Sequence, residues 1–522
     1  MAEGRAVRGY LNMSANLAAM LYATLAMGLA AMVLPADAFG GNRIRGLAAW
    51  FLAALALLFL NDALITFLFM FIILLVLAPF APERRAAFFI IVAPAFPLYV
   101  QQYLPFPGIN YLTLLDYYRV ASFALLFPLL FVPRSKDAPS LACTLSDSCV
   151  VGYVLYTSAM VGEGENFTSG LRFLLDQLLL VAAPYFAISR AAIRRQDVET
   201  CLRAFLVASA ILAAVAIIAT LKRWDFYRYK ETLSPLTLPE YRGGFLRIGA
   251  TINTHSLGFH LAACIVLLEY LKTSMAFGMI RLWGLRAMLL AGLFFTASRG
   301  ATTALITAAG GYVVLSVRSS VIRWLLVVGM AGAAWIGATW LLSGDSAEFD
   351  TYGTFDYRQQ LLSTSLRYIS EHPFFGDIHF LQSGEFNALV QGQGIIDITN
   401  LYLQVALKYG LVGFALFFMP FALTLYRLSF VAPDGADDLG GVGVHRMRST
   451  VAALLIGWLV LIATTSDVGL TLHLGLVLLA LGRSLAYKPT QAPQGSLMVE
   501  LVRTVIELVR SKFRTGGNPN VR

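Results

Sequence analysis

Residues 343–400 read SGDSAEFDTYGTFDYRQQLLSTSLRYISEHPFFGDIHFLQSGEFNALVQGQGIIDITN, and they form the only long polar segment between stretches that are apolar enough to span a bilayer. The segment carries eight acidic side chains and only two basic ones, Arg358 and Arg367. Most connections in compact proteins are about 4 to 6 residues long, and longer ones tend to be functional. We therefore interpret this segment as the cap of an active site.

The rest of the chain has the composition of an integral membrane protein. Of its 522 residues, 58% are hydrophobic and 13% are charged, and the mean hydropathy is +0.71. Apolar runs near 18 residues recur along the whole length, each long enough to cross about 30 Å of hydrocarbon. Every backbone polar group in lipid must be paired internally, so these runs are expected to be helices.

The expected fold is an all-α, polytopic transmembrane helix bundle of about 13–15 spans, with short helices in one large periplasmic loop. The run 46–80 is broken by Asn61-Asp62 and is interpreted as two short spans, although one long tilted span is the alternative. The first run follows Arg5 and Arg8 and is interpreted as a retained helix, not a cleaved signal peptide. The other spans are expected near 16–34, 86–104, 114–132, 147–161, 170–189, 201–221, 252–271, 283–297, 301–317, 324–342, 411–428, 450–465 and 470–487.

The formal charge of +9 has a simpler source than nucleic-acid binding, because Lys and Arg accumulate in the cytoplasmic loops of membrane proteins. Basic residues fall on alternate connections, at 84–85, 134–136, 190–195, 281–286, 318–323 and 427–448. The opposite face, which holds the acidic segment, is then periplasmic.

Domain boundaries follow from this organisation. We expect N-terminal helices (1–112), a central core (113–342) with an outer basic segment (222–249), the large loop (343–410), C-terminal helices (411–487) and a cytoplasmic amphipathic tail (488–522). In the tail, apolar residues recur at spacings of three and four, which suits a helix lying on the inner leaflet. A solvated or partner-binding helix is the alternative.

Arginines on the outer face break the positive-inside trend. Arg242 and Arg247 lie in the outer basic segment, and Arg299 stands in a turn between two spans. An arginine near hydrocarbon is costly unless paired, and its fork of donors fits phosphate oxygens. These residues are therefore candidates for binding a pyrophosphate. For Arg299, pairing with a loop carboxylate or with lipid phosphate is the alternative.

The acidic segment offers acid–base groups. Nine positions at about 100° each place Arg358 and Arg367 on opposite faces of a helix, so at most one of them points into a given site. Arg367 and Glu371 are four residues apart and could simply pair along the helix surface. A single histidine among His255, His260, His372 and His379 could serve as a general base.

Metal ligation and disulfides are not indicated by the sequence. The four cysteines form no CxxC pattern, and no histidines have the HExxH spacing or a comparable one. Asp467 and His473 lie near the last spans and could form a buried polar pair.

Four separated motifs resemble the bacterial O-antigen ligase and Wzy-type polymerase superfamily of membrane glycosyltransferases. The first runs from Arg247-Ile248-Gly249 to Asn253, and the second is the Ser298-Arg299-Gly300 turn. The third runs from Arg367 through Glu371-His372 to Pro373-Phe374-Phe375-Gly376. The fourth runs from Thr399-Asn400 to Tyr409-Gly410 and Gly413. The likeness covers roughly residues 110–485.

One position departs from the ligase pattern. Ligases of this family usually place a histidine directly before the asparagine, and Thr399 occupies that position here. The resemblance therefore favours a polymerase over a ligase, with Asp397 or His372 substituting for the missing base.

The resemblance implies a GT-C-like enzyme of the bacterial inner membrane that works without a metal or other cofactor. It would transfer a glycan from undecaprenyl pyrophosphate onto a sugar hydroxyl at the periplasmic face, with inversion. Arg299, Arg247, His372 and Asp397 are then the expected catalytic residues, and Arg242, Arg358, Arg367, Glu371, Asn400 and Asn253 are the expected substrate-binding residues. Besides the lipid bilayer and the lipid-linked glycan, a chain-length regulator and export machinery are the partners expected.

A transporter is the alternative from another class. Transporters commonly show internal repeats with interrupted helices, and the sequence shows none.

Overall fold

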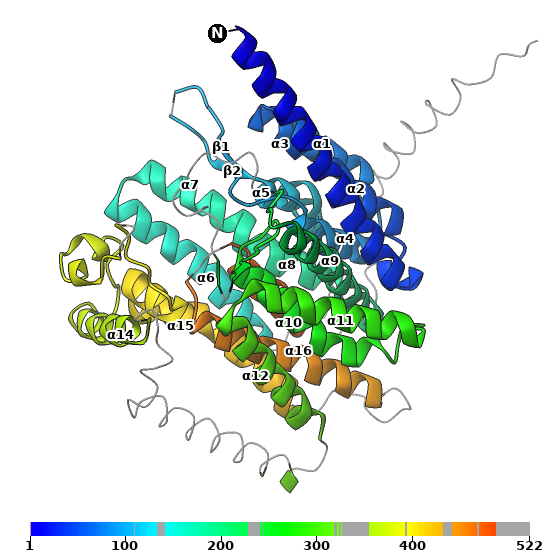
Figure 1. Cartoon of the computed structure of the whole chain (residues 1–522). Coiled ribbons are helices and arrows are strands. Elements are labelled where there is room, and N and C mark those ends of the chain that lie inside the picture. The colour runs from blue at the N-terminus through cyan, green and yellow to red at the C-terminus, as the bar shows by residue number, and fades with distance from the viewer. Residues whose placement is uncertain are drawn as a thin grey trace, which may run out of the picture.

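The computed structural model is a bundle of long helices with two small hairpins (Figure 1). It describes residues 2–108, 110–132, 141–227, 241–242, 244–317, 321–322, 325, 354–391, 394–431, 441–466 and 469–486.

The N-terminal half contains the helices α1 (Ala2–Val33), α2 (Arg43–Phe59), α3 (Ala63–Leu77), α4 (Pro82–Val92), α5 (Tyr117–Ala121), α6 (Leu141–Gly164), α7 (Phe167–Gln177), α8 (Ala183–Ala191) and α9 (Arg195–Lys222). The C-terminal half contains α10 (Thr254–Leu271), α11 (Met279–Thr296), α12 (Arg299–Ser316), α14 (Thr354–Glu371), α15 (Leu401–Phe430), α16 (Gly441–Ile462) and α17 (Thr471–Ala486). The strands β1 (Gln101–Tyr103) and β2 (Leu114–Asp116) form one antiparallel hairpin, and β3 (Tyr241–Arg242) and β4 (Phe245–Leu246) form the other.

Seven of the described helices are long and apolar enough to cross a membrane, and three shorter apolar helices accompany them. The expected all-α polytopic bundle is therefore confirmed, as are short helices in the large loop, where α14 is followed by two 3-10 turns. The total of 13–15 spans stays a prediction. The expected span 324–342 and the amphipathic tail lie outside the described residues except for residue 325.

The break at Asn61-Asp62 divides two helices, as the sequence predicted. The carboxylate of Asp62 accepts hydrogen bonds from the amides of Leu64 (2.8 Å) and Ile65 (3.0 Å), which caps the N-terminus of α3. Such a cap satisfies amides that have no partner within the helix.

The span expected at 86–104 is shorter than predicted. The helix α4 ends at Val92, a single 3-10 turn covers Ala93–Ala95, and the chain at Phe96 is extended. Two prolines account for the difference, because Pro94 and Pro97 lack an amide donor and the residue before a proline avoids the helical conformation. Apolar composition alone did not reveal this early end.

The helices α9 and α10 form the centre of the bundle. In α9, 89% of the residues in its most apolar window are buried, and in α10 the share is 83%, against 28% in α11. The central helices are therefore surrounded by protein, whereas α11 presents most of its surface outward.

Small residues bring α12 and α16 into close contact. A Cβ atom added to Gly457 of α16 would lie 2.9 Å from both the carbonyl oxygen of Ala304 and the Cβ of Ala308. Helices in membranes associate largely through such close packing, because lipid is as apolar as the side chains. This contact holds the first half of α12 against the second half of α16.

A charged pair joins α6 to α17 inside the bundle. The Nε and Nη2 atoms of Arg483 donate to the two carboxylate oxygens of Asp147, each at 2.7 Å. Both side chains are largely buried. Charged side chains inside a helix bundle are usually paired in this way, because a bidentate ion pair offsets the cost of burying each charge.

The large loop is attached to the bundle through backbone hydrogen bonds at Gly410. This residue has φ 61° and ψ −169°, which interrupts the helical hydrogen bonding of α15. The amide of Leu411 donates to the carbonyl of Pro373 (2.8 Å) instead of Leu407, and the carbonyl of Leu407 accepts from the amide of Asp377 (2.8 Å). The third and fourth motifs therefore meet at this joint, and α14 lies beside the start of α15 (Figure 1).

We predict that Gly410→Ala detaches the loop. A Cβ atom there would lie 2.2 Å from the carbonyl oxygen of Phe374, and the positive φ adds strain. The free energy of unfolding should fall by more than about 1 kcal/mol, and limited proteolysis should cut the loop sooner. Gly28→Ala is the control, because a Cβ at Gly28 has nothing within 4 Å. Equal proteolysis rates for the two variants would contradict the joint.

Candidate functional site

The first two motifs are joined by a row of three polar side chains. The Nη2 atom of Arg247 lies 3.3 Å from Nε2 of His255, and Nδ1 of His255 lies 3.2 Å from Oγ of Ser298. Arginine can only donate, so Nε2 of His255 accepts and its Nδ1–H donates to the serine. The Nε atom of Arg247 also donates to the carbonyl of Thr296 (3.2 Å). His255 therefore holds Arg247 against the turn that precedes α12.

The turn places Arg299 at the first position of α12. The hydroxyl of Ser298 caps the helix by accepting from the amide of Ala301 (3.4 Å), and Ala297 has a left-handed backbone with φ 46°. Arg299 is exposed, and among the described residues its guanidinium has no hydrogen-bond or ion-pair partner. The start of a helix favours anions, because its first amides point outward unpaired.

Asn253 has a structural role at the start of α10. Its Oδ1 atom accepts from the amide of His255 at 2.8 Å, so its side chain is the N-terminal cap of the helix that carries His255. For Arg242, the structure places only the backbone, in β3 opposite Phe245 of β4. The side chain of Arg242 lies outside the described part of the chain.

The end of α16 brings the loop to the start of α12. A Cβ atom at Gly300 would lie 2.5 Å from Oγ1 of Thr464, so these two residues are in close contact. From the loop, Nη2 of Arg358 reaches the carbonyl of the same Thr464 at 3.5 Å. Arg358 and Gly300, the residue after Arg299, therefore both contact Thr464.

Asp397 belongs to the same neighbourhood. Its backbone carbonyl accepts from the hydroxyl of Tyr357 (2.8 Å), the residue next to Arg358. Burial raises the pKa of the Asp397 carboxyl, and this effect is only partly opposed by a hydrogen bond from the Ser466 side chain and by the charge of Arg358. A carboxylate in such surroundings is a better base than an exposed one.

The other loop candidates lie away from this group. Arg367 pairs with Glu385 (3.2 Å), whereas Arg358 contacts Thr464. Both arginines stand on the one helix α14, as their predicted placement on opposite faces requires. Glu371 and His372 are exposed at the end of α14, where the His372 ring lies 4.8 Å from the ring of Tyr368. Within the described residues, no contact joins them to Arg299 or Arg247. Their predicted roles stay predictions.

Asn400 caps α15 in the way that Asn253 caps α10. Its Oδ1 atom accepts from the amides of Tyr402 (2.9 Å) and Leu403 (3.3 Å). The asparagine of the fourth motif therefore begins the helix that Gly410 later interrupts, and it follows Asp397 by three residues.

The sequence did not single out Thr464 and Ser466, and it gave Ser298 only as part of the turn that carries Arg299. His255 was only one of four histidines considered, although its position two residues after Asn253 is the signal that could have ranked it first. In the described part of the chain, no group of three or more His, Cys, Asp or Glu side chains is placed to hold a metal ion.

Comparison with known protein families agrees with the motifs. Residues 284–418 match the family model described as O-antigen ligase. The similarity is to the O-antigen ligase family. The matched region runs from α11 to the middle of α15, so it includes Arg299, Arg358, Asp397 and the joint at Gly410. The predicted resemblance to the O-antigen ligase and Wzy-type superfamily is confirmed, and no curated protein matches the chain.

We predict that His255→Leu lowers the free energy of unfolding by about 1 to 3 kcal/mol, because it removes the acceptor that a buried arginine uses. Thermal unfolding of the detergent-solubilised protein measures this. His372→Leu is the matched control, since His372 is exposed, and it should leave the unfolding midpoint unchanged. If both variants unfolded at the same temperature as the parent, the row would have no structural role.

Proposed function

We propose that the protein is a polymerase that joins undecaprenyl-pyrophosphate-linked oligosaccharide repeat units into a surface or secreted polysaccharide. The observation that carries this proposal is that Arg358 and Gly300, which follows Arg299, both contact Thr464, while Asp397 lies close enough to Arg358 to feel its charge. These contacts support a site that combines arginines with a carboxyl group of raised pKa, within the region that matches the O-antigen ligase family.

The arginines suit the leaving group. When the bond between the sugar and the lipid pyrophosphate breaks, negative charge grows on the pyrophosphate, and donors already in position lower the barrier. Arg299 would contact this group directly, because its guanidinium is exposed at the start of α12. Arg247 would be held for the same purpose by His255.

Asp397 suits the acceptor. As the sugar hydroxyl attacks, its proton must leave, and a carboxylate with a raised pKa can take it. Arg358 would keep this carboxylate ionised and near the site through its charge. Closure of the loop over the site would exclude water, which would otherwise hydrolyse the donor.

Thr399 favours polymerase over ligase. A ligase would carry glycan to a lipid A core acceptor with a histidine at this position, and here the amide of Thr399 donates to the carbonyl of Asp397 at 3.0 Å. The base in this proposal is therefore Asp397. The enzyme would act at the periplasmic face of the bacterial inner membrane, with a chain-length regulator and export machinery as partners.

We expect Arg299→Ala to be expressed but to leave lipid-linked single repeats unpolymerised, with the rate lowered by about 100-fold or more. The assay supplies purified protein with the native lipid-linked repeat unit and resolves chain lengths. Arg281→Ala is the matched control, because Arg281 is exposed at the opposite end of α11. Polysaccharide of normal chain length from Arg299→Ala would contradict the proposal. Single transfer to a lipid A core acceptor would establish a ligase, and movement of intact substrate across liposomes would establish a transporter.

The pH profile tests Asp397. A base works only when ionised, so a raised pKa means that kcat/KM should fall on acidification at a higher pH than the ordinary aspartate value near 4. Arg358 lowers this pKa, so Arg358→Gln should move the acid limb to still higher pH, whereas Arg281→Gln should not. Asp397→Asn should remove the activity. An acid limb at the same pH in Arg358→Gln and the parent would exclude Asp397 as the base.

A further inference from the structure

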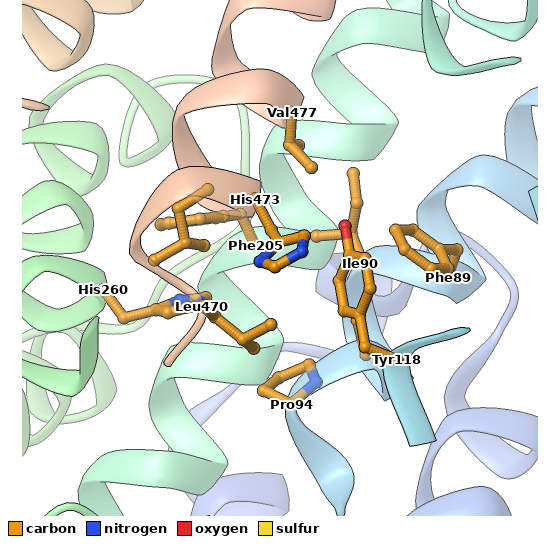
Figure 2. Close-up of a pocket in the computed structure, with 11 residues that line it drawn as sticks. Phe89, Ile90, Pro94, Tyr118, Phe205, His260, Leu470, His473 and Val477 are labelled. Atoms are coloured by element: carbon orange, nitrogen blue, oxygen red, sulfur yellow. The ribbon is translucent and has the colours of Figure 1, made fainter. Parts of the chain in front are cut away.

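A small cavity inside the bundle is lined in part by three polar side chains that the proposed reaction does not use. It has a volume of about 20 Å³ and lies between α4, α5, α9, α10 and α17. Its polar lining comes from Tyr118, His260 and His473, whose rings surround one space in Figure 2. The remaining lining is apolar, so these three residues account for the polar groups that reach the cavity.

Two of these side chains have a buried polar atom without a protein partner. Within the described part of the chain, this holds for the hydroxyl of Tyr118 and for Nε2 of His260, whereas the ring of His473 interacts with the backbone of Gly469. Tyr118 and His260 are each only 2% exposed. Buried polar atoms in native proteins are nearly always hydrogen-bonded, either to protein or to ordered water.

The local contacts decide what each atom needs. Ser209 donates its proton to the carbonyl of Phe205 (2.9 Å), so its oxygen is an acceptor for Nδ1–H of His260 at 3.3 Å. Nε2 of His260 then carries no hydrogen, so it can only accept a hydrogen bond. Tyr118 brings a hydroxyl donor, and its ring lies 4.1 Å from that of His473. One ligand must therefore both donate and accept.

We propose that this cavity is a binding site for an ordered water molecule that bridges Tyr118, His260 and His473. A water needs roughly 10 to 15 Å³ and two to four polar partners, and this cavity offers both. The water accepts from the hydroxyl of Tyr118 and donates its two hydrogens to Nε2 of His260 and to the remaining ring nitrogen of His473. It thereby links α5, α10 and α17 through hydrogen bonds that the side chains cannot make with one another.

The cavity lies beside the second turn of α10, where His260 is located. Ser256, in the first turn of α10, contacts the hydroxyl of Thr471 at 3.0 Å and accepts from the amide of Leu470 at 3.1 Å. Leu470 itself lines the cavity. The bound water would therefore support the packing of α17 against α10, the helix whose residue His255 contacts Arg247 and Ser298.

Radiolytic hydroxyl footprinting of the full chain in nanodiscs tests the proposal, because bound water generates radicals beside buried side chains. Tyr117 is the internal control: it is fully buried with an unpartnered hydroxyl like Tyr118, but it does not line the cavity. Tyr118 should be oxidised several times faster than Tyr117. Equal rates would overturn the proposal.

A pair of variants gives a second readout. If the cavity holds water, Tyr118→Phe removes a hydrogen bond and should lower the thermal unfolding midpoint, whereas Tyr117→Phe removes only an unpartnered hydroxyl and should leave it unchanged or raise it. A midpoint for Tyr118→Phe that is unchanged or raised would mean a dry cavity. The footprinting comparison needs no variant, so it stands even where a substitution impairs folding.

Discussion

The backbone hydrogen bonds exchanged at Gly410 attach the large loop to the bundle, and this loop carries Arg358 and Asp397 of the candidate site. A helix that continued through this residue would pair Leu411 with Leu407, and no carbonyl or amide would remain for the turn that ends the third motif. Because the exchange involves backbone atoms at a glycine with positive φ, no other residue type fits there without strain. The loop helix α14 follows from this attachment, and with it Arg358 reaches the end of α16.

The sequence predicted local features well. The lengths of the apolar runs predicted most of the helices, and the Asn61-Asp62 break marked a boundary between two of them. Helical periodicity assigned Arg358 and Arg367 to opposite faces of one helix, and both residues do stand on α14. Each of these depends on residues within a few turns of one another, which is the range over which helical periodicity operates. The early end of α4 was missed because apolar composition outweighed the two prolines in the prediction.

Contacts between distant residues could not be read in the same way. Ser298 and His255 are 43 residues apart, and the carbonyl that Arg358 contacts lies 106 residues further on. No pattern of spacing encodes such pairs, so motif resemblance could suggest that these segments belong together but could not say which atoms meet. For this reason Thr464 and Ser466, which belong to none of the four motifs, were not predicted to be part of the site.

The close packing of α12 on α16 has a consequence for how a lipid reaches the site. With Gly457 against Ala304 and Ala308, no hydrocarbon chain can pass between these helices. The neighbouring α11, by contrast, turns Trp283, Leu290 and Phe294 outward along one side, and it ends directly before the turn that carries Arg299. Under the proposed function, the polyprenyl tail of the donor would stay in the bilayer along this outer side of α11, and only its head group would enter the protein.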